Sequence, residues 1–196
     1  KKNSNKISYA ITEKDKNLWE AINKGIKASK GEVICVLNSD DVFFKNALKI
    51  AHNYFKSKKI EYLFGSVIKN KVYGNFYPEK IYYKFNIFPS HSISFFVKKK
   101  IHKDLGNYDE SLKYCADYSF FFKLFKSKKY RYKNGKKSEL IGYFNTKGLS
   151  SRIGFFKTLY YESIVRFKNN QNPLFIFFLL LIKILNKLRN KLFYFR

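Results

Sequence analysis

Residues Gly31 to Asp41 read G-E-V-I-C-V-L-N-S-D-D, and this stretch decides the fold. Its apolar run, Val33 to Leu37, is typical of a central parallel strand that is buried on both faces. The run ends abruptly at residues 38–41, which are turn formers. Ligands of open α/β sheets bind beyond the carboxyl ends of the strands. The turn after this strand is therefore the first candidate site.

Strand and helix patterns alternate on both sides of this stretch. Apolar residues at helical spacing predict helices over residues 18–28, 46–56 and 116–125, with a short basic helix between residue 97 and Gly106. Apolar runs predict strands over residues 6–12, 62–68, 72–77, 92–97 and 140–144. This alternation predicts one α/β domain over residues 1–150, with a mostly parallel sheet flanked by helices.

The character of the chain changes after Ser150. Residues 151–170 have a helical pattern, and residues 174–182 are uninterruptedly apolar. Lysines then recur every four residues on one helix face, at positions 183, 187 and 191, and no acidic residue follows position 162. The apolar run is shorter than the ~20 residues that span a bilayer. Residues 151–196 are therefore expected to be an amphipathic helical tail on an anionic membrane, lysines toward the headgroups. A helix packed on the domain's own core is the alternative.

The composition narrows the class of protein. Hydrophobic residues make up 45% of the chain, which excludes a disordered protein. The net charge of +26 suits nucleic acid, an anionic membrane or a nucleotide diphosphate, although a lysine-rich surface also serves solubility alone. Cys35 and Cys115 are too few for a disulfide framework and lack metal-ligand spacing, so a reducing, cytoplasmic setting is expected. The chain contains no Met, and we interpret it as a segment that begins downstream of the true N-terminus.

Two groups of residues could carry chemistry. The paired carboxylates Asp40 and Asp41 could hold a hard divalent cation that bridges phosphate oxygens. The competing interpretation is a plain turn that caps the next helix. Asp117, at the start of a predicted helix, could act as a general base or merely complement the helix dipole. Neither group decides between these interpretations by itself.

Taken together, four stretches in order resemble the family 2 glycosyltransferases of the GT-A (Rossmann-like) fold. They are TEKDKNLWEAINKGI (residues 12–26), GEVICVLNSDD (31–41), HSISFFV (91–97) and LGNYDESLKYCADYSF (105–120). A weaker element, Gly-Leu-Ser at residues 148–150, resembles the end of such domains. The resemblance covers residues 12 to about 151.

The resemblance implies roles for individual residues. Asp40 would be the ligand of a divalent metal, Mn²⁺ or Mg²⁺, in a variant D-x-D motif whose first position is Asn38. Asp117 would be the catalytic base of an inverting displacement. The segments that approach the donor would contribute Asp15, Asn23, Lys24, Gly25, Asn38, Ser39, Asp41 and His91. For His91, a structural role is the alternative.

The expected function follows from the same resemblance. The chain would transfer one sugar per encounter from a nucleotide sugar, UDP-linked in the first instance, to a membrane-proximal or lipid-linked glycan in surface polysaccharide synthesis. It would work at the cytoplasmic face of the cell membrane. The Q-x-x-R-W signature of processive synthases cannot occur, because the only Gln is Gln171 and the only Trp is Trp19. The family's first strand–helix–strand unit would precede Lys1, so the fold is expected to be N-terminally incomplete.

Two alternatives remain open. A catalytically inactive, glycosyltransferase-like domain would share these motifs, because fold alone does not determine activity. A basic module that binds nucleic acid would explain the charge and the aromatic residues. No RRM, zinc-finger or basic-region pattern is present, however, so no nucleic-acid partner is expected.

Overall fold

The apolar run of residues 33–37 contains a short strand, β1 (Val33–Cys35), in the computed structural model, which describes residues 6–85, 91–146 and 153–193. β1 begins a four-stranded sheet of order β1-β6-β3-β7, in which the other strands are β6 (Phe95–Lys98), β3 (Tyr62–Phe64) and β7 (Tyr132–Asn134). A second sheet has the order β2-β8-β4-β5 and contains β2 (Val42–Phe43), β8 (Leu140–Tyr143), β4 (Ser66–Ile68) and β5 (Val72–Tyr73).

Both sheets are mixed, and this corrects the prediction of a mostly parallel sheet. Among the described strands, only β3–β7 and β4–β8 pair in parallel, whereas β1–β6, β3–β6, β2–β8 and β4–β5 are antiparallel. Short apolar runs indicate burial on both faces but carry no information on strand direction. β6 is such a run, and it lies antiparallel to both of its neighbours.

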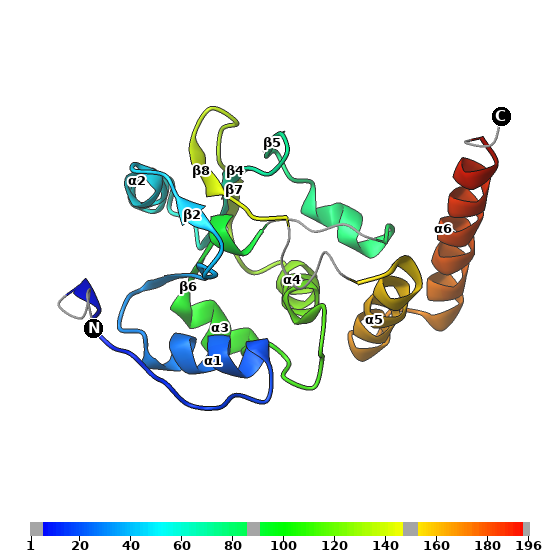
Figure 1. The fold of residues 1–196 in the computed structure, drawn as a ribbon, viewed down its shortest axis with the longest axis horizontal. Coiled ribbons are helices and arrows are strands. Elements are labelled where there is room, and N and C mark those ends of the chain that lie inside the picture. Colours follow the sequence, from blue (N-terminus) through cyan, green and yellow to red (C-terminus); the bar gives the residue numbers. More distant parts are fainter. Residues whose placement is uncertain (1–5, 86–90, 147–152, 194–196) are drawn as a thin grey trace.

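Helices cover both faces of the first sheet (Figure 1). Tyr62 and Phe64 of β3 join the larger core with α1 (Leu18–Ala28), α3 (Lys99–Leu105) and α4 (Ala116–Ser127). The intervening Leu63 points to the other face, where it packs with Ala47 and Ala51 of α2 (Ala47–Lys58). Successive strand residues face opposite sides of a sheet, so helices on both faces require an unbroken apolar run. The predicted α/β fold with flanking helices is confirmed in this respect.

Two chain segments cross from the first sheet to the second beside each other. The predicted strand 62–68 breaks at Gly65, so that β3 belongs to one sheet and β4 to the other. β7 and β8 make the same change of sheet through Gly135, whose N–H donates to the Phe64 carbonyl at 2.8 Å. A Cβ on Gly65 would lie 2.4 Å from Ile141 Cγ1, and one on Gly135 would lie 3.3 Å from the Gly65 Cα. Only glycine therefore lets the two crossings pack this closely.

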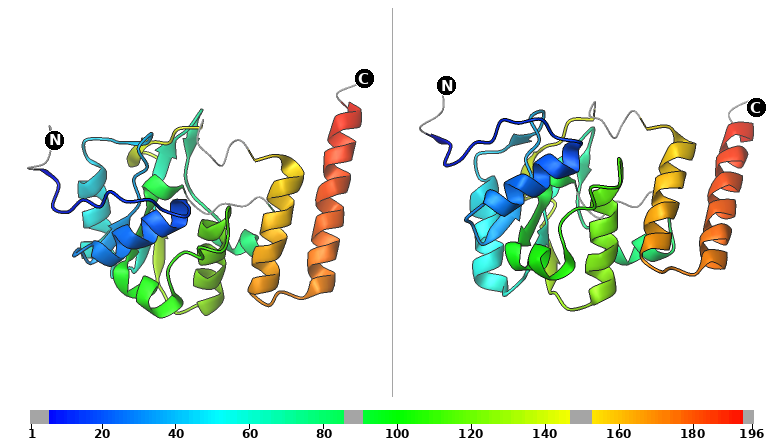
Figure 2. Two further views of the ribbon diagram at one scale, coloured as in Figure 1. Left: turned by 60° about the horizontal axis from the view of Figure 1, so that its bottom comes forward. Right: turned by 90° about the horizontal axis from the view of Figure 1, so that it is seen from below.

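The C-terminal helices form a hairpin on one side of the molecule. α5 (Phe155–Lys168) packs against α4, and α6 (Pro173–Phe193) lies along α5 as the outermost helix (Figure 2). Val165 of α5 belongs to the larger core. Ile176 and Leu179 of α6 form a smaller cluster with Leu159 and Phe85. The domain boundary at residue 150 stays a prediction, and α5 is packed as part of the main body.

Other predicted strands are shorter than expected or absent. Residues 6–12 contain no strand, and the side chains of residues 6–14 are exposed. Of the strand predicted over residues 72–77, only β5 forms. The strand predicted over residues 92–97 begins with a 3₁₀ turn, η3 (Ser92–Ser94), before β6. Another 3₁₀ segment, η2 (Pro78–Tyr82), packs against α4. Apolar alternation cannot form a strand without a partner edge for its backbone hydrogen bonds.

A buried histidine makes stability depend on pH. His102 of α3 is 3% exposed, stacks on Phe120 at 4.5 Å, and has no hydrogen-bond partner for either ring nitrogen among the described residues. Burial lowers the pKa of His102 from 6.5 to about 4. The unfolded chain therefore binds this proton more tightly, and the free energy of unfolding falls as pH drops from 6.5 to about 4.

We expect His102→Phe to remove this dependence. The phenyl ring keeps the stacking contact and has no polar atoms to bury. Relative to the variant, the wild type should lose roughly 3 kcal/mol of unfolding free energy across that pH interval. Urea unfolding of both proteins at a series of pH values would measure the difference. Parallel pH curves for the two proteins would contradict the assignment.

Candidate active site

A cavity of about 1050 Å³ opens beyond the carboxyl end of β1. It lies between α1, the turn after β1, the start of α4 and the end of β8. Seven of the predicted site residues line it: Gly25, Asn38, Ser39, Asp40, Asp41, His91 and Asp117. Residues far apart in sequence thus converge where the sheet rule places a ligand.

The two carboxylates of the turn after β1, Asp40 and Asp41, lie in different environments. Asp41 is only 7% exposed and accepts hydrogen bonds from the Asn145 backbone N–H at 3.0 Å and from Asn38 Nδ2 at 3.1 Å. Asn38 Nδ2 also donates to Ser92 Oγ at 2.9 Å. Burial raises the pKa of Asp41 above its ordinary value, and these hydrogen bonds oppose the shift. Asp41 therefore anchors the turn, while Asp40 is exposed and available to a ligand.

The residues present fit a divalent metal only as part of a donor complex. No group of three or more His, Cys, Asp or Glu side chains is arranged to hold a metal within the described part of the chain. Asp40 supplies one carboxylate beside the cavity. Mg²⁺ commonly binds through one or two carboxylates together with substrate phosphates and water. The site therefore suits a metal that arrives with a diphosphate, not a pre-formed metal cage.

Asp117 occupies the first turn of α4. The helix begins abruptly after Cys115, whose φ of 63° lies in the left-handed region that non-glycine residues seldom adopt. Asp117 Oδ1 accepts a hydrogen bond from the Tyr118 N–H at 2.8 Å. Burial raises the pKa of Asp117, and hydrogen bonds from the backbone N–H groups of Tyr118 and Asp117 itself partly oppose the shift. A poorly solvated carboxylate is a stronger base than an ordinary aspartate, as general-base catalysis requires.

His91 lies on the wall of the same cavity. Its ring stacks on Phe144 with 4.2 Å between centroids and meets Tyr73 edge-on at 6.1 Å. Burial, with a smaller contribution from the positive charge of Lys69, lowers the pKa of His91 to about 4. The imidazole is therefore neutral at pH 7. The stacking suits a structural role as well as a ligand contact, so a binding role for His91 stays a prediction.

Three residues that were predicted to bind the sugar donor do not line the cavity: Asp15, Asn23 and Lys24. Lys24 forms ion pairs with Glu13 at 2.6 Å and with Asp15 at 2.7 Å, and these hold the preceding segment against α1. Asn23 donates to the Tyr108 carbonyl at 2.8 Å and accepts from its N–H at 3.1 Å. In the structure these side chains bind other segments of the chain. Their roles in binding the sugar donor stay predictions.

Several residues of the cavity were not predicted from the sequence. Trp19 of α1 lies against the ring of Tyr108, with 5.4 Å between centroids, and both line the cavity. Lys69, after β4, and Thr158, on α5, also line it. Trp19 and Tyr108 had a signal in the sequence, because they lie within the stretches 12–26 and 105–120. The others come from elements whose approach depends on tertiary packing.

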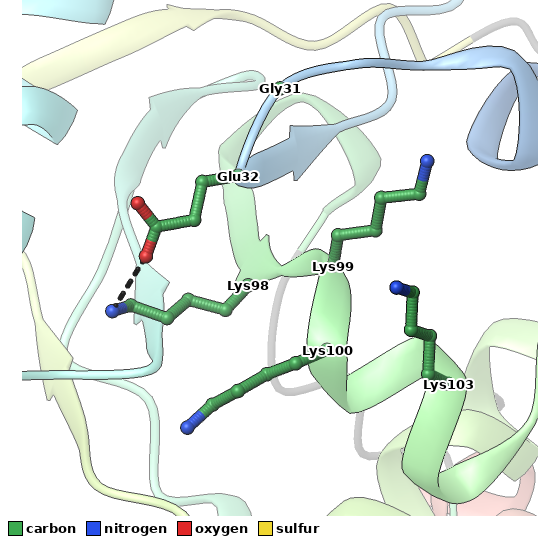
Figure 3. Close-up of a pocket in the computed structure, with 6 residues that line it drawn as sticks. All are labelled: Gly31, Glu32, Lys98, Lys99, Lys100 and Lys103. Carbon is green, nitrogen blue, oxygen red and sulfur yellow. Dashed lines mark ion pairs between the residues drawn. The ribbon is translucent and has the colours of Figure 1, made fainter.

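A smaller hollow of about 440 Å³ lies beside Gly31 and the start of α3 (Figure 3). Four lysines surround it: Lys98, Lys99, Lys100 and Lys103. Three of these ammonium groups already have partners. Lys98 pairs with Glu32 at 2.9 Å, Lys100 pairs with Glu61, and Lys99 Nζ donates to the Ser29 carbonyl. We assign no ligand to this hollow.

Comparison with known proteins agrees with this geometry. The model of glycosyl transferase family 2 matches residues 1–145, so the chain belongs to that family. The resemblance inferred from the four sequence stretches is thereby confirmed. The element 148–150 lies outside the described residues.

Particular relatives extend the comparison. The chain is 30% identical over 135 residues to an uncharacterized glycosyltransferase of Rickettsia typhi, covering 60% of this chain and 42% of that protein. It is 27% identical over 224 residues to one of Methanocaldococcus jannaschii, covering 95% and 74% of the two chains. The fold resembles residues 1–349 of S. aureus TarS in complex with UDP-GlcNAc, with a TM-score of 0.60, 17% identity, and 89% and 55% of the two chains covered. The chain spans less than half the length of the rickettsial relative.

Proposed function

We propose that this chain transfers a sugar from a nucleotide sugar to a hydroxyl of a glycan or lipid-linked acceptor near a membrane. The donor that we expect is a UDP-sugar. One observation carries the proposal. The exposed Asp40 and the half-buried Asp117, 77 positions apart in the sequence, line a single cavity at the carboxyl end of β1. The family assignment and the UDP-GlcNAc complex of TarS support the donor class.

The donor's diphosphate would lie at the turn after β1. The buried Asp41, held by Asn38 and Asn145, keeps the turn in shape and leaves the Asp40 carboxylate toward the ligand. Asp40 would hold Mn²⁺ or Mg²⁺ together with the phosphate oxygens. When bound, the metal would neutralise the charge that develops on the leaving diphosphate.

Asp117 would serve as the base. Its carboxylate takes the proton of the acceptor hydroxyl while the oxygen attacks the anomeric carbon. The bond from that carbon to the diphosphate oxygen breaks as the new glycosidic bond forms. Attack from the side opposite the leaving group inverts the configuration. The raised pKa of Asp117 suits this step, because a stronger base takes the proton more readily.

A donor titration tests the proposal. UDP-, GDP- and dTDP-sugars are added in the presence of Mn²⁺, and the fluorescence of Trp19, which lines the cavity, is recorded. We expect one nucleotide class to saturate the signal. Asp40→Ala should weaken that binding about tenfold or more, a cost of about 1.4 kcal/mol.

The matched control is Asp104→Ala, which removes an exposed carboxylate from α3, outside the cavity lining. It should bind the donor as the wild type does. A folded wild-type protein that responds to none of the donors, with or without Mn²⁺, would contradict the proposal and favour the inactive-domain alternative.

A further inference from the structure

An apolar stripe runs along the outer face of α6. Seven large side chains compose this outer stripe, and each is between 41% and 69% exposed: Leu174, Phe177, Phe178, Leu181, Ile182, Leu185 and Leu188. Their spacing of three and four residues places them on one side of the helix. Contiguous exposed apolar patches larger than ~300–600 Å² are uncommon on soluble monomers and mark interaction sites. The outer stripe therefore calls for a partner.

The inner face of α6 is already occupied. Ile176 and Leu179 are buried against α5, with Leu180 and Ile184 packed around them. Lys187 also lies on this side, with its Nζ 3.9 Å from the centre of the Phe155 ring. Figure 2 shows α6 as the outermost helix, with only α5 beside it. The outward surface is thus apolar. The lysine row, which the sequence suggested would meet the headgroups, begins on the protein's side of the helix.

Charge identifies the partner. The chain carries a net charge of +26, and no acidic residue follows Glu162. Two copies that met through their outer stripes would bring the same uncompensated cations together, which opposes association. An anionic bilayer accepts both features, because its acyl region takes the apolar residues and its phosphates attract the cations. Within the described residues, no helix is long and apolar enough to cross a membrane.

We infer that α6 docks on an anionic lipid surface, with its outer stripe in the acyl region and its axis along the interface. Arg189 follows Leu185 by four residues and therefore lies on the side of the outer stripe. A long basic side chain can extend from such a position to the headgroups. α5 packs against α6 and contributes Thr158 to the cavity. The docked helix is therefore separated from the candidate active site by α5. The inference goes beyond sugar transfer and does not depend on it.

Vesicle binding by the full chain tests the inference. Sedimentation is measured with phosphatidylglycerol-containing vesicles and with pure phosphatidylcholine vesicles. We expect the wild type to prefer the anionic vesicles. Leu181→Glu/Leu185→Glu, which places two carboxylates in the outer stripe, should reduce binding about tenfold or more. The control Leu48→Glu/His52→Glu adds the same charge at the same spacing on exposed positions of α2 and should bind nearly as the wild type does.

Further measurements separate lipid insertion from its competitors. Phe178→Trp in a Trp19→Phe background should be quenched by brominated lipid, whereas Leu48→Trp in the same background should not. Sedimentation equilibrium without vesicles should give monomers. Unchanged vesicle binding by Leu181→Glu/Leu185→Glu, or binding without quenching of Phe178→Trp, would overturn the inference. Dimers that this double variant dissociates would assign the outer stripe to a second copy instead.

Discussion

Asp117→Asn should abolish sugar transfer while leaving donor binding nearly intact. The amide keeps the size of the side chain and can still accept the Tyr118 N–H hydrogen bond that Asp117 accepts at 2.8 Å. It cannot take a proton from an acceptor hydroxyl, and loss of a general base typically lowers the rate about 10²–10⁴-fold. Steady-state transfer rates, with donor affinity from Trp19 fluorescence, would measure the two effects separately.

The pH profile gives a second readout of this substitution. A base works only when deprotonated, so activity should fall as pH decreases through the pKa of Asp117. Burial raises that pKa, so the fall should begin at a higher pH than for an ordinary aspartate. The residual activity of Asp117→Asn should not show this decrease at low pH. Asp109→Asn is the matched control from the same segment, because Asp109 pairs with Lys168 and lies outside the cavity lining. Equal losses of transfer and donor binding in Asp117→Asn would contradict the role of base.

Arg166→Met should cost about 3–5 kcal/mol of unfolding free energy, a large share of the stability of a small domain. Arg166 of α5 is fully buried, and its guanidinium donates to the carbonyls of Ile81, Tyr82 and Lys84. It also donates to Tyr118 Oη at 2.8 Å, next to Asp117. Met approximates the volume but removes a donor from each of these acceptors, and it removes the positive charge that interacts with Glu162, which is also fully buried.

Urea unfolding would measure this cost. Arg166→Lys should be intermediate, because an ammonium keeps the charge but cannot reproduce the fork of donors. Arg131→Met is the control, since Arg131 is exposed and its substitution should change stability by less than about 0.5 kcal/mol. Wild-type stability in Arg166→Met would show that α5 is not held by this side chain.

The sequence predicted the helices better than the strands, for a physical reason. Helical periodicity is a local signal, and the helices predicted over residues 18–28 and 116–125 form almost as expected. Strand direction and partners depend on residues far away in the chain. The break at Gly65 could not be foreseen, because its cause is the close approach of Ile141 and Gly135.

The candidate site divides in the same way. Asp40 and Asp117 follow local signals, a turn after an apolar run and the start of a helix, and both line the cavity. Lys24 looked equally available in the sequence, yet its charge is taken up by Glu13 and Asp15. Competition of this kind between a ligand and neighbouring side chains is invisible until the segments are folded together.

The paired crossings at Gly65 and Gly135 have a consequence for how the molecule unfolds. Gly65 alone separates β3 from β4, and the short segment 135–139 joins β7 to β8. If either sheet unfolded, the parallel pairs β3–β7 and β4–β8 would be disrupted where the two sheets meet. The two sheets therefore form one cooperative unit. The turn that carries Asp40 and the strand order beneath it cannot melt separately from the rest of the domain.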